Sequence, residues 1–123
     1  MKINAASYFY ELIQEFPILE KDINSEDPDM IHTRMEYFSD YTNSQIGSNN
    51  NEELKRCFSF QESRVEHIDD KLLNALKVSY CESLLLGKYS SQMERVMGFM
   101  EPKFRELYLQ YEIYYRNIFN KNN

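Results

Sequence analysis

The chain has 123 residues, of which 42% are hydrophobic and only three are Gly and three are Pro. This length suits one domain with a real core, and the scarcity of helix breakers argues against a turn-rich β fold. The formal net charge of −6 argues against general nucleic-acid binding, which needs clustered Lys and Arg to neutralise phosphates. We therefore expect one all-helical domain over residues 1–123.

The N-terminal helix is predicted over residues 4–16, where apolar side chains recur at helical spacing and Asn4 can cap the first turn. Pro17 discourages the helical conformation at Phe16, so the helix should end there. A short turn of helix is expected within residues 18–26.

The second long helix is predicted to begin at residues 27–29, because an acidic residue followed by Pro is a common helix start. It should run up to Gly47, which suits the left-handed conformation after a helix. A third helix is predicted over residues 51–68, with Asn50 and Glu53 spaced as a capping box.

Residues 69–86 form the most informative segment of the chain. Apolar and small side chains cover an arc of roughly 200°, which is wider than the ~100° apolar stripe of a surface helix. Asp69 can cap the start of this helix, and Gly87 can end it. Because such a helix must be packed on several sides, we predict that it is the central buried helix.

The last third of the chain is predicted to hold two more helices. Ser91 and Glu94 are spaced as a capping box for a helix over residues 91–100, and Pro102 then begins or kinks a long aromatic-rich helix. The expected fold class is therefore an all-α, single-domain bundle of about five to six helices, with residues 69–86 at its centre.

Two runs of this sequence resemble a family of small bacterial all-helical proteins that has no assigned activity. Residues 78–84, Val-Ser-Tyr-Cys-Glu-Ser-Leu, are similar to its Val-Ser-Phe-Leu-Glu-Asn-Leu, and residues 101–105, Glu-Pro-Lys-Phe-Arg, to its Gly-Pro-Lys-Leu-Arg. Phe16-Pro17 also fits its pattern, so the resemblance covers nearly the whole chain. Ser83 replaces the family's Asn, which puts a polar role there in doubt. Some members resemble immunity proteins, so the resemblance implies a toxin partner.

Signatures of metal binding and catalysis are sparse. His32 and Glu36 lie four residues apart on one predicted helix face, but a single pair of ligands is not a metal site. Cys57 and Cys81 fall inside predicted helices without an adjacent His, so we expect two buried free thiols rather than nucleophiles or a disulfide. We therefore expect no metal, no cofactor and no catalytic residues.

Two polar residues interrupt the apolar faces of the predicted helices. Gln61 lies within the stripe of the third helix, where a core hydrogen bond to the end of a neighbouring helix is the expected role and partner binding is the alternative. Glu82 lies at the edge of the arc of the central helix, and a carboxylate there needs a partner. We expect a structural ion pair with Arg105 or Lys103.

The charges are unevenly distributed, since residues 1–31 hold two basic and seven acidic residues. An acidic segment suits a basic protein partner. We expect a partner to contact three acids of this segment and three apolar anchors elsewhere: Glu20, Asp22, Glu26, Phe60, Leu109 and Ile113. Burial of Phe60 under a neighbouring element is an equal alternative, and Leu109 and Ile113 could instead pack against the preceding helix.

The favoured function is a non-catalytic intracellular protein that binds a protein partner, with an immunity protein against a bacterial toxin as the specific form. A cytoplasmic location is expected because the chain shows neither an export signal nor an apolar run of membrane length, and no membrane binding is expected. The alternative is a small-molecule-binding or enzymatic domain with a pocket beside the central helix. An exposed apolar and acidic surface favours the former, and a buried polar cavity with strongly shifted carboxylates favours the latter.

Overall fold

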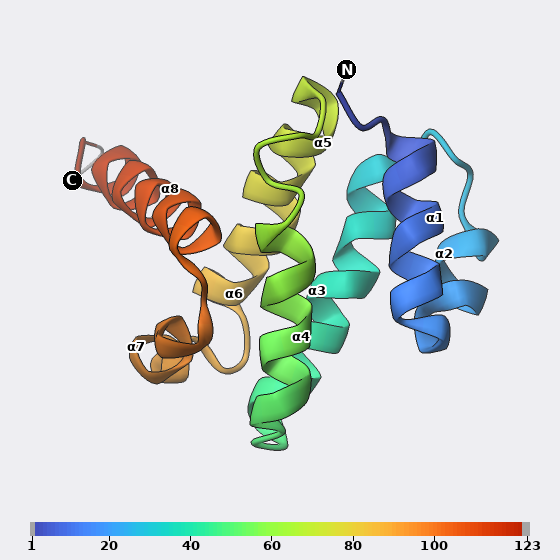
Figure 1. Ribbon diagram of the computed structural model, residues 1–123. Coiled ribbons are helices and arrows are strands. Elements are labelled where there is room, and N and C mark those ends of the chain that lie inside the picture. The colour runs from blue at the N-terminus through green and yellow to red at the C-terminus, as the bar shows by residue number, and fades with distance from the viewer. Residues whose placement is uncertain (1, 122–123) are drawn as a thin grey trace.

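Figure 1 shows the computed structural model, which describes residues 2–121, as a bundle of helices with α1 and α2 on one side and α8 on the other. In chain order the α-helices are α1 (Ala5–Glu15), α2 (Glu20–Ser25), α3 (Ile31–Gly47), α4 (Asn51–Glu62), α5 (Asp70–Ala75), α6 (Glu82–Leu86), α7 (Met93–Val96) and α8 (Pro102–Lys121). Extended pairing within residues 2–121 is limited to one bridge between Ile3 and Ile68. The predicted all-α fold class is confirmed.

The predicted helix caps are present at three starts. Asn4, Asn50 and Asp69 each accept a hydrogen bond from the backbone N–H three residues later, at 2.9, 3.3 and 2.9 Å. These bonds satisfy N–H groups that have no partner inside the helix, which is why the starts of α1, α4 and α5 could be located from the sequence.

The second long helix begins later than predicted. Asp27 does not cap it, because its carboxylate accepts from the Asp29 N–H at 2.9 Å and its carbonyl accepts from the Met30 N–H at 2.9 Å. These bonds close a turn, and α3 therefore begins at Ile31. The acidic residues that looked like a helix start belong instead to the connection between α2 and α3.

Gly47 serves close packing rather than a left-handed turn. It is the last residue of α3, and the positive backbone angle after this helix belongs to Asn49, with φ of 57°. A Cβ atom on Gly47 would collide with the tip of the Tyr89 ring. The close approach of Tyr89, a residue far along the chain, therefore explains the glycine. The sequence around Gly47 did not indicate this contact.

The central helix is one continuous run in which α5 and α6 are joined by a π-helical turn, Leu76–Cys81. It contacts both α3 and α8, which confirms the predicted central helix. The π-helical turn was not predicted. Two hydrogen bonds attach it to α3: His32 Nδ1 lies 2.8 Å from the Ser79 hydroxyl, and the Thr42 hydroxyl lies 2.7 Å from that of Tyr80.

Two predicted helices are shorter than expected. The third predicted helix ends at Glu62, where bonds that span three residues replace those that span four: the N–H of Arg64 donates to the carbonyl of Gln61 at 3.1 Å, and the N–H of His67 donates to that of Arg64 at 2.8 Å. The helix predicted over residues 91–100 is only the single turn α7, flanked by 3₁₀ turns at Ser90–Gln92 and Met97–Phe99. Pro102 begins α8 rather than kinking it.

Aromatic rings and one polar pair fill the core between α1, α3 and α4. Phe16 and Phe38 lie with ring centres 5.3 Å apart, and both pack against Phe60. The buried Tyr8 hydroxyl donates to Gln61 Oε1 at 2.7 Å. Gln61 therefore makes a core hydrogen bond as predicted, but its partner is a side-chain hydroxyl within α1 and not the end of a helix.

Candidate functional site

The acids predicted to meet a partner lie on and just after α2. Glu20 and Asp22 are exposed in the first turn of α2, and none of the ion pairs in the described part of the chain involves either. Glu26 is half-buried and accepts a hydrogen bond from the Tyr37 hydroxyl at 2.9 Å. Glu20 and Asp22 are therefore available to a partner, whereas Glu26 already has a structural contact.

Two other acids of the N-terminal segment are neutralised by arginines on and just after α4. Glu11 pairs with Arg64 at 3.5 Å, and Glu15 pairs with Arg56 at 3.4 Å. These arginines are 53 and 41 residues away in the chain, so no local pattern could have revealed the pairs. The unpaired acidic surface is consequently smaller than the sequence suggested, and it is concentrated around α2.

An exposed isoleucine lies beside these acids. Ile18 follows Pro17 in the 3₁₀ turn before α2 and is 71% exposed, while its neighbour Leu19 is buried. We call residues 17–25 the α2 surface; a shallow hollow of about 530 Å³ is lined from within it. The sequence had treated residues 18–26 only as a short helix, and Ile18 was missed because its exposure depends on which way the turn after Pro17 faces.

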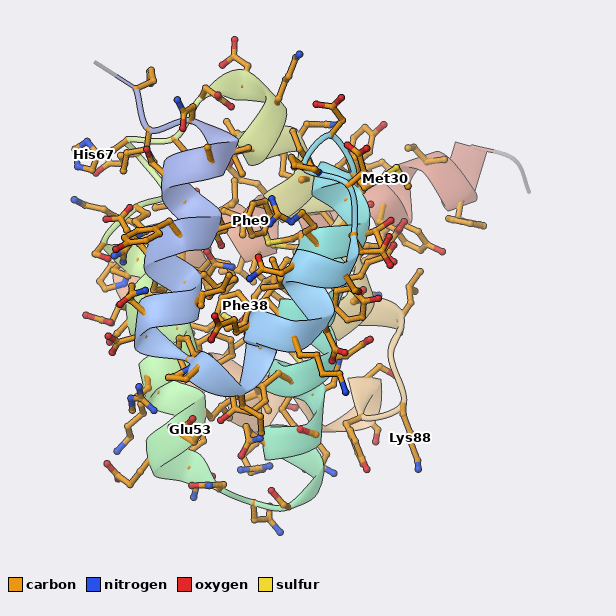
Figure 2. All side chains as sticks on the ribbon, turned by 90° about the vertical axis from the view of Figure 1, so that its right-hand side faces the viewer. Phe9, Met30, Phe38, Glu53, His67 and Lys88 are labelled. Carbon is orange, nitrogen blue, oxygen red and sulfur yellow. The ribbon has the colours of Figure 1, made fainter. Side chains whose placement is uncertain are left out.

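The α2 surface is held firmly against the bundle. The Arg34 guanidinium donates from Nε to the carbonyl of Ile23, at the end of α2, at 3.1 Å and lies 4.9 Å from the centre of the Phe9 ring. Ile23 is itself fully buried. Burial lowers the pKa of Arg34. Figure 2 looks onto α1 and α2, with the labelled Phe9 and Phe38 in the layer behind them.

Phe60 is not an exposed anchor. Only 4% of it is accessible, and its ring lies in edge-to-face contact with Tyr8 and Phe38. The Arg64 guanidinium stacks over the ring at 3.8 Å. The alternative prediction, burial of Phe60, is correct. Helix α1 packs over this face of α4 through Tyr8, and Arg64 covers the ring.

The two predicted anchors on α8 differ in exposure. Ile113 is 58% exposed, whereas Leu109 is half-buried. Tyr114, which the sequence did not single out, is equally exposed at 58% and belongs to a groove beside the central helix. Apolar residues occur on every side of α8 near Ile113, and Tyr114 is one of them. This pattern could have identified Tyr114 as an exposed residue.

Glu82 does not form the predicted ion pair. Its Oε1 accepts a hydrogen bond from the Tyr111 hydroxyl at 3.0 Å. Lys103 pairs with Glu66 instead, at 2.6 Å. Burial, followed by the bond to Glu82, raises the pKa of Tyr111. The prediction of a structural partner on α8 holds, but the partner is the hydroxyl of Tyr111, which lies further along α8 than either predicted cation.

A polar hollow does lie beside the central helix, between α3 and the turn after α6. Asp40, Asn43 and Glu82 line it, and it measures about 540 Å³ and is widely open to solvent. Burial raises the pKa of Asp40. One shifted carboxylate in an open hollow gives little support to a small-molecule or enzymatic site, which needs an enclosed pocket with converging groups.

The thiols and histidines lie in environments without an activating group. Cys57 and Cys81 are buried and free, and burial raises the pKa of the Cys57 thiol to about 12 and also raises that of Cys81. His32 contacts the Ser79 hydroxyl rather than Glu36. Within the described residues, no group of three His, Cys, Asp or Glu side chains could hold a metal ion.

Over the described residues, no helix is both long and apolar enough to cross a bilayer.

In a comparison with known proteins, the chain matches no curated protein and no solved structure. It does match a domain of unknown function, DUF7674, over residues 9–116, which run from α1 to the outer part of α8. Because this match covers most of the chain, the protein belongs to the DUF7674 family.

Proposed function

We propose that this protein is a non-catalytic, intracellular protein-binding protein of the immunity type, which neutralises a basic partner by docking it on the α2 surface. One observation carries the proposal: Ile18 is 71% exposed, and Glu20 and Asp22, which flank the exposed Lys21 just after it, form no ion pair among the described residues. An exposed apolar anchor close to two exposed carboxylates is a suitable docking surface for a basic protein.

The two kinds of residue have different roles in this proposal. Exposed carboxylates accelerate the encounter with a basic partner and discriminate against acidic ones. Ile18 supplies affinity when its side chain leaves water. Because Arg34 and Ile23 already fix α2 against the bundle, the partner would not have to order this segment on binding.

Burial of the two thiols, Cys57 and Cys81, supports a non-catalytic role. Both thiols are enclosed and kept protonated by burial, and they remain free rather than joined in a disulfide. Free thiols suit a reducing, intracellular location. The resemblance to immunity-type proteins adds the class of partner, a toxin domain with a basic surface.

The test is an association experiment with the polypeptide encoded beside this chain's gene. The variant Glu20→Lys/Asp22→Lys is compared with Asp70→Lys/Glu94→Lys, a matched control in which both acids also lie in first helical turns. We expect the α2 variant to associate at least about tenfold more slowly at low salt and to lose its salt dependence, and the control to stay within about twofold of the unmodified protein.

A second variant addresses the anchor. Ile18→Ala should leave the association rate nearly unchanged and increase the dissociation rate, because apolar contacts form after the encounter. Equal slowing by both charge-reversal variants would show a general charge effect and would contradict docking at α2. Survival of cells that express the toxic neighbour with the α2 variant as well as with the unmodified chain would also contradict it.

A further inference from the structure

The outer half of α8 is apolar on nearly every side. From Leu107 to Phe119 only four residues are polar. The inner face is buried through Phe104 and Tyr108, but Ile113, Tyr114, Ile118 and Phe119 remain 38–58% exposed. A helix that is apolar all round is normally buried on all sides. The contacts within residues 2–121 therefore leave a large part of this helix uncovered.

Part of this uncovered surface forms a groove against the central helix. Leu107, Tyr111 and Tyr114 recur along α8 at intervals of four and three residues and form one wall. Val78 and Lys77, from the π-helical turn, belong to the opposite wall. The groove measures about 280 Å³, and Figure 1 shows α8 leading away from the bundle beside the central helix. We call it the α8 groove.

The one charged residue that lines the α8 groove is positive, and the two carboxylates bonded to its lining, Glu82 through Tyr111 and Glu106 through Gln110, already have a partner. Lys77 lines it, and no acidic residue does. Lys71 lies on α5 one helical turn before Asn74, another lining residue, and is exposed. Neither Lys77 nor Lys71 forms an ion pair with a carboxylate of the described residues. These cations are therefore available to an external acid.

We propose that the α8 groove is a second interaction surface, which receives an acidic amphipathic helix of a partner protein. The apolar face of that helix packs on Val78, Leu107 and Tyr114, and carboxylates along its edge pair with Lys77 and Lys71. Side chains of two helices, not a free sheet edge, form the walls, so the fitting occupant is a helix rather than a strand.

A second copy of this chain fits the groove less well. The helix it would offer is its own α8, which carries four basic residues against two acidic ones: Lys103, Arg105, Arg116, Lys121, Glu106 and Glu112. That balance would place further positive charge beside Lys77, which is unfavourable at close range. An acidic helix supplies the opposite charge. This surface is distinct from the α2 surface and lies on the opposite side of the bundle (Figures 1 and 2).

The probe is a synthetic 18-residue helical peptide with Leu on one face and Glu on the others, carrying a rhodamine label. Two control peptides replace every Glu by Lys or scramble the order so that the Leu residues no longer share a face. Binding is measured by fluorescence anisotropy with the full chain. We expect the acidic peptide to bind at least about tenfold more tightly than either control.

Variants then locate the site. Lys77→Glu should weaken binding of the acidic peptide at least about tenfold and favour the basic one, and Lys88→Glu, an exposed lysine outside the groove, should leave both affinities unchanged. Ile118→Arg should also weaken binding, because Ile118 is partly exposed and lies one helical turn beyond Tyr114, a lining residue of the groove. Circular dichroism verifies that each variant keeps its helices.

Three outcomes would overturn the proposal. The first is equal binding of the acidic and basic peptides, and the second is peptide binding that Lys77→Glu and Ile118→Arg both leave intact. The third is sedimentation of the free protein as a dimer that Ile118→Arg dissociates, since the occupant would then be a second copy. Each can occur whether or not the α2 surface binds its partner, so failure here is distinguishable from failure of the proposed function.

Discussion

Two tyrosines of the core differ in what their hydroxyl groups contact. Tyr8 and Tyr108 are both fully buried. The Tyr8 hydroxyl donates to Gln61 Oε1 at 2.7 Å, whereas the Tyr108 hydroxyl has no hydrogen-bond partner among the described residues. A buried hydroxyl stabilises a protein only when it is bonded, so these two side chains should respond oppositely to the loss of one oxygen atom.

We expect Tyr8→Phe to lower the free energy of unfolding by about 1–3 kcal/mol, because Gln61 would lose its partner inside the core. Tyr108→Phe should leave that free energy unchanged or raise it by up to about 1 kcal/mol, because it removes a hydroxyl that is buried without a bond. Denaturant unfolding of the two variants checks both. A larger loss for Tyr108→Phe than for Tyr8→Phe would contradict the assignment.

At the scale of elements, one hydrogen bond joins the central helix to α8. Tyr111 donates to Glu82 at 3.0 Å, and both side chains lie near the edge of the core. A hydrogen bond to a carboxylate is stronger than one between neutral groups, but partial exposure weakens it. Its contribution is best isolated by a double-mutant cycle, in which losses of packing cancel.

We expect Glu82→Ala and Tyr111→Phe to show a coupling free energy of about 1 kcal/mol. Glu82→Gln should cost less than Glu82→Ala, because an amide oxygen still accepts the hydrogen bond. Lys103→Ala, measured by the same thermal denaturation, should show no coupling to Glu82, since Lys103 pairs with Glu66. Coupling between Glu82 and Lys103 would restore the ion pair predicted from the sequence and refute the bond to Tyr111.

At the scale of the whole molecule, buried thiols and phenols make stability depend on alkaline pH. Burial raises the pKa of Cys57 from its ordinary value of 9.0 to about 12, and burial also raises the pKa values of Cys81, Tyr8 and Tyr80. Above pH 9 the unfolded chain therefore loses protons that the folded chain keeps. The state that binds fewer protons gains as pH rises, and that state is the unfolded one.

The free energy of unfolding should accordingly be insensitive to these groups below pH 9 and fall between pH 9 and 12, by up to about 1.4 kcal/mol per pH unit for each group that titrates only in the unfolded chain. Guanidinium unfolding at pH 7, 9, 10 and 11 measures it. A Cys57→Ala/Cys81→Ala variant should show a shallower decline. An equally steep decline in that variant would assign the effect to other groups.

Helix starts and the central helix were predictable because their signals are local. Asn4, Asn50 and Asp69 cap helices through bonds that span three residues, and a window of the sequence that long contains both partners. The wide apolar arc of residues 69–86 placed that helix in the middle for a similar reason. Asp27 shows the limit of such signals, because the same acid can close a turn instead of capping a helix.

The candidate sites were predictable only in part, because exposure is decided by distant segments. Glu20 and Asp22 are exposed as expected, but Arg56 on α4 and Arg64 just after it reach across to neutralise two neighbouring acids. The same reach of Arg64 covers Phe60. No sequence window links residues that are separated by 41 or 53 positions.

The sequence by itself determined an all-helical domain, most helix starts, the identity of the central helix and the burial of both cysteines. These features follow from apolar spacing and capping, which act within a few residues. The tertiary structure decided the π-helical turn, the burial of Phe60, the bond between Glu82 and Tyr111 and the exposure of Ile18 and Tyr114. Each of these depends on which side chains meet across the bundle, and only the packing of whole helices sets that.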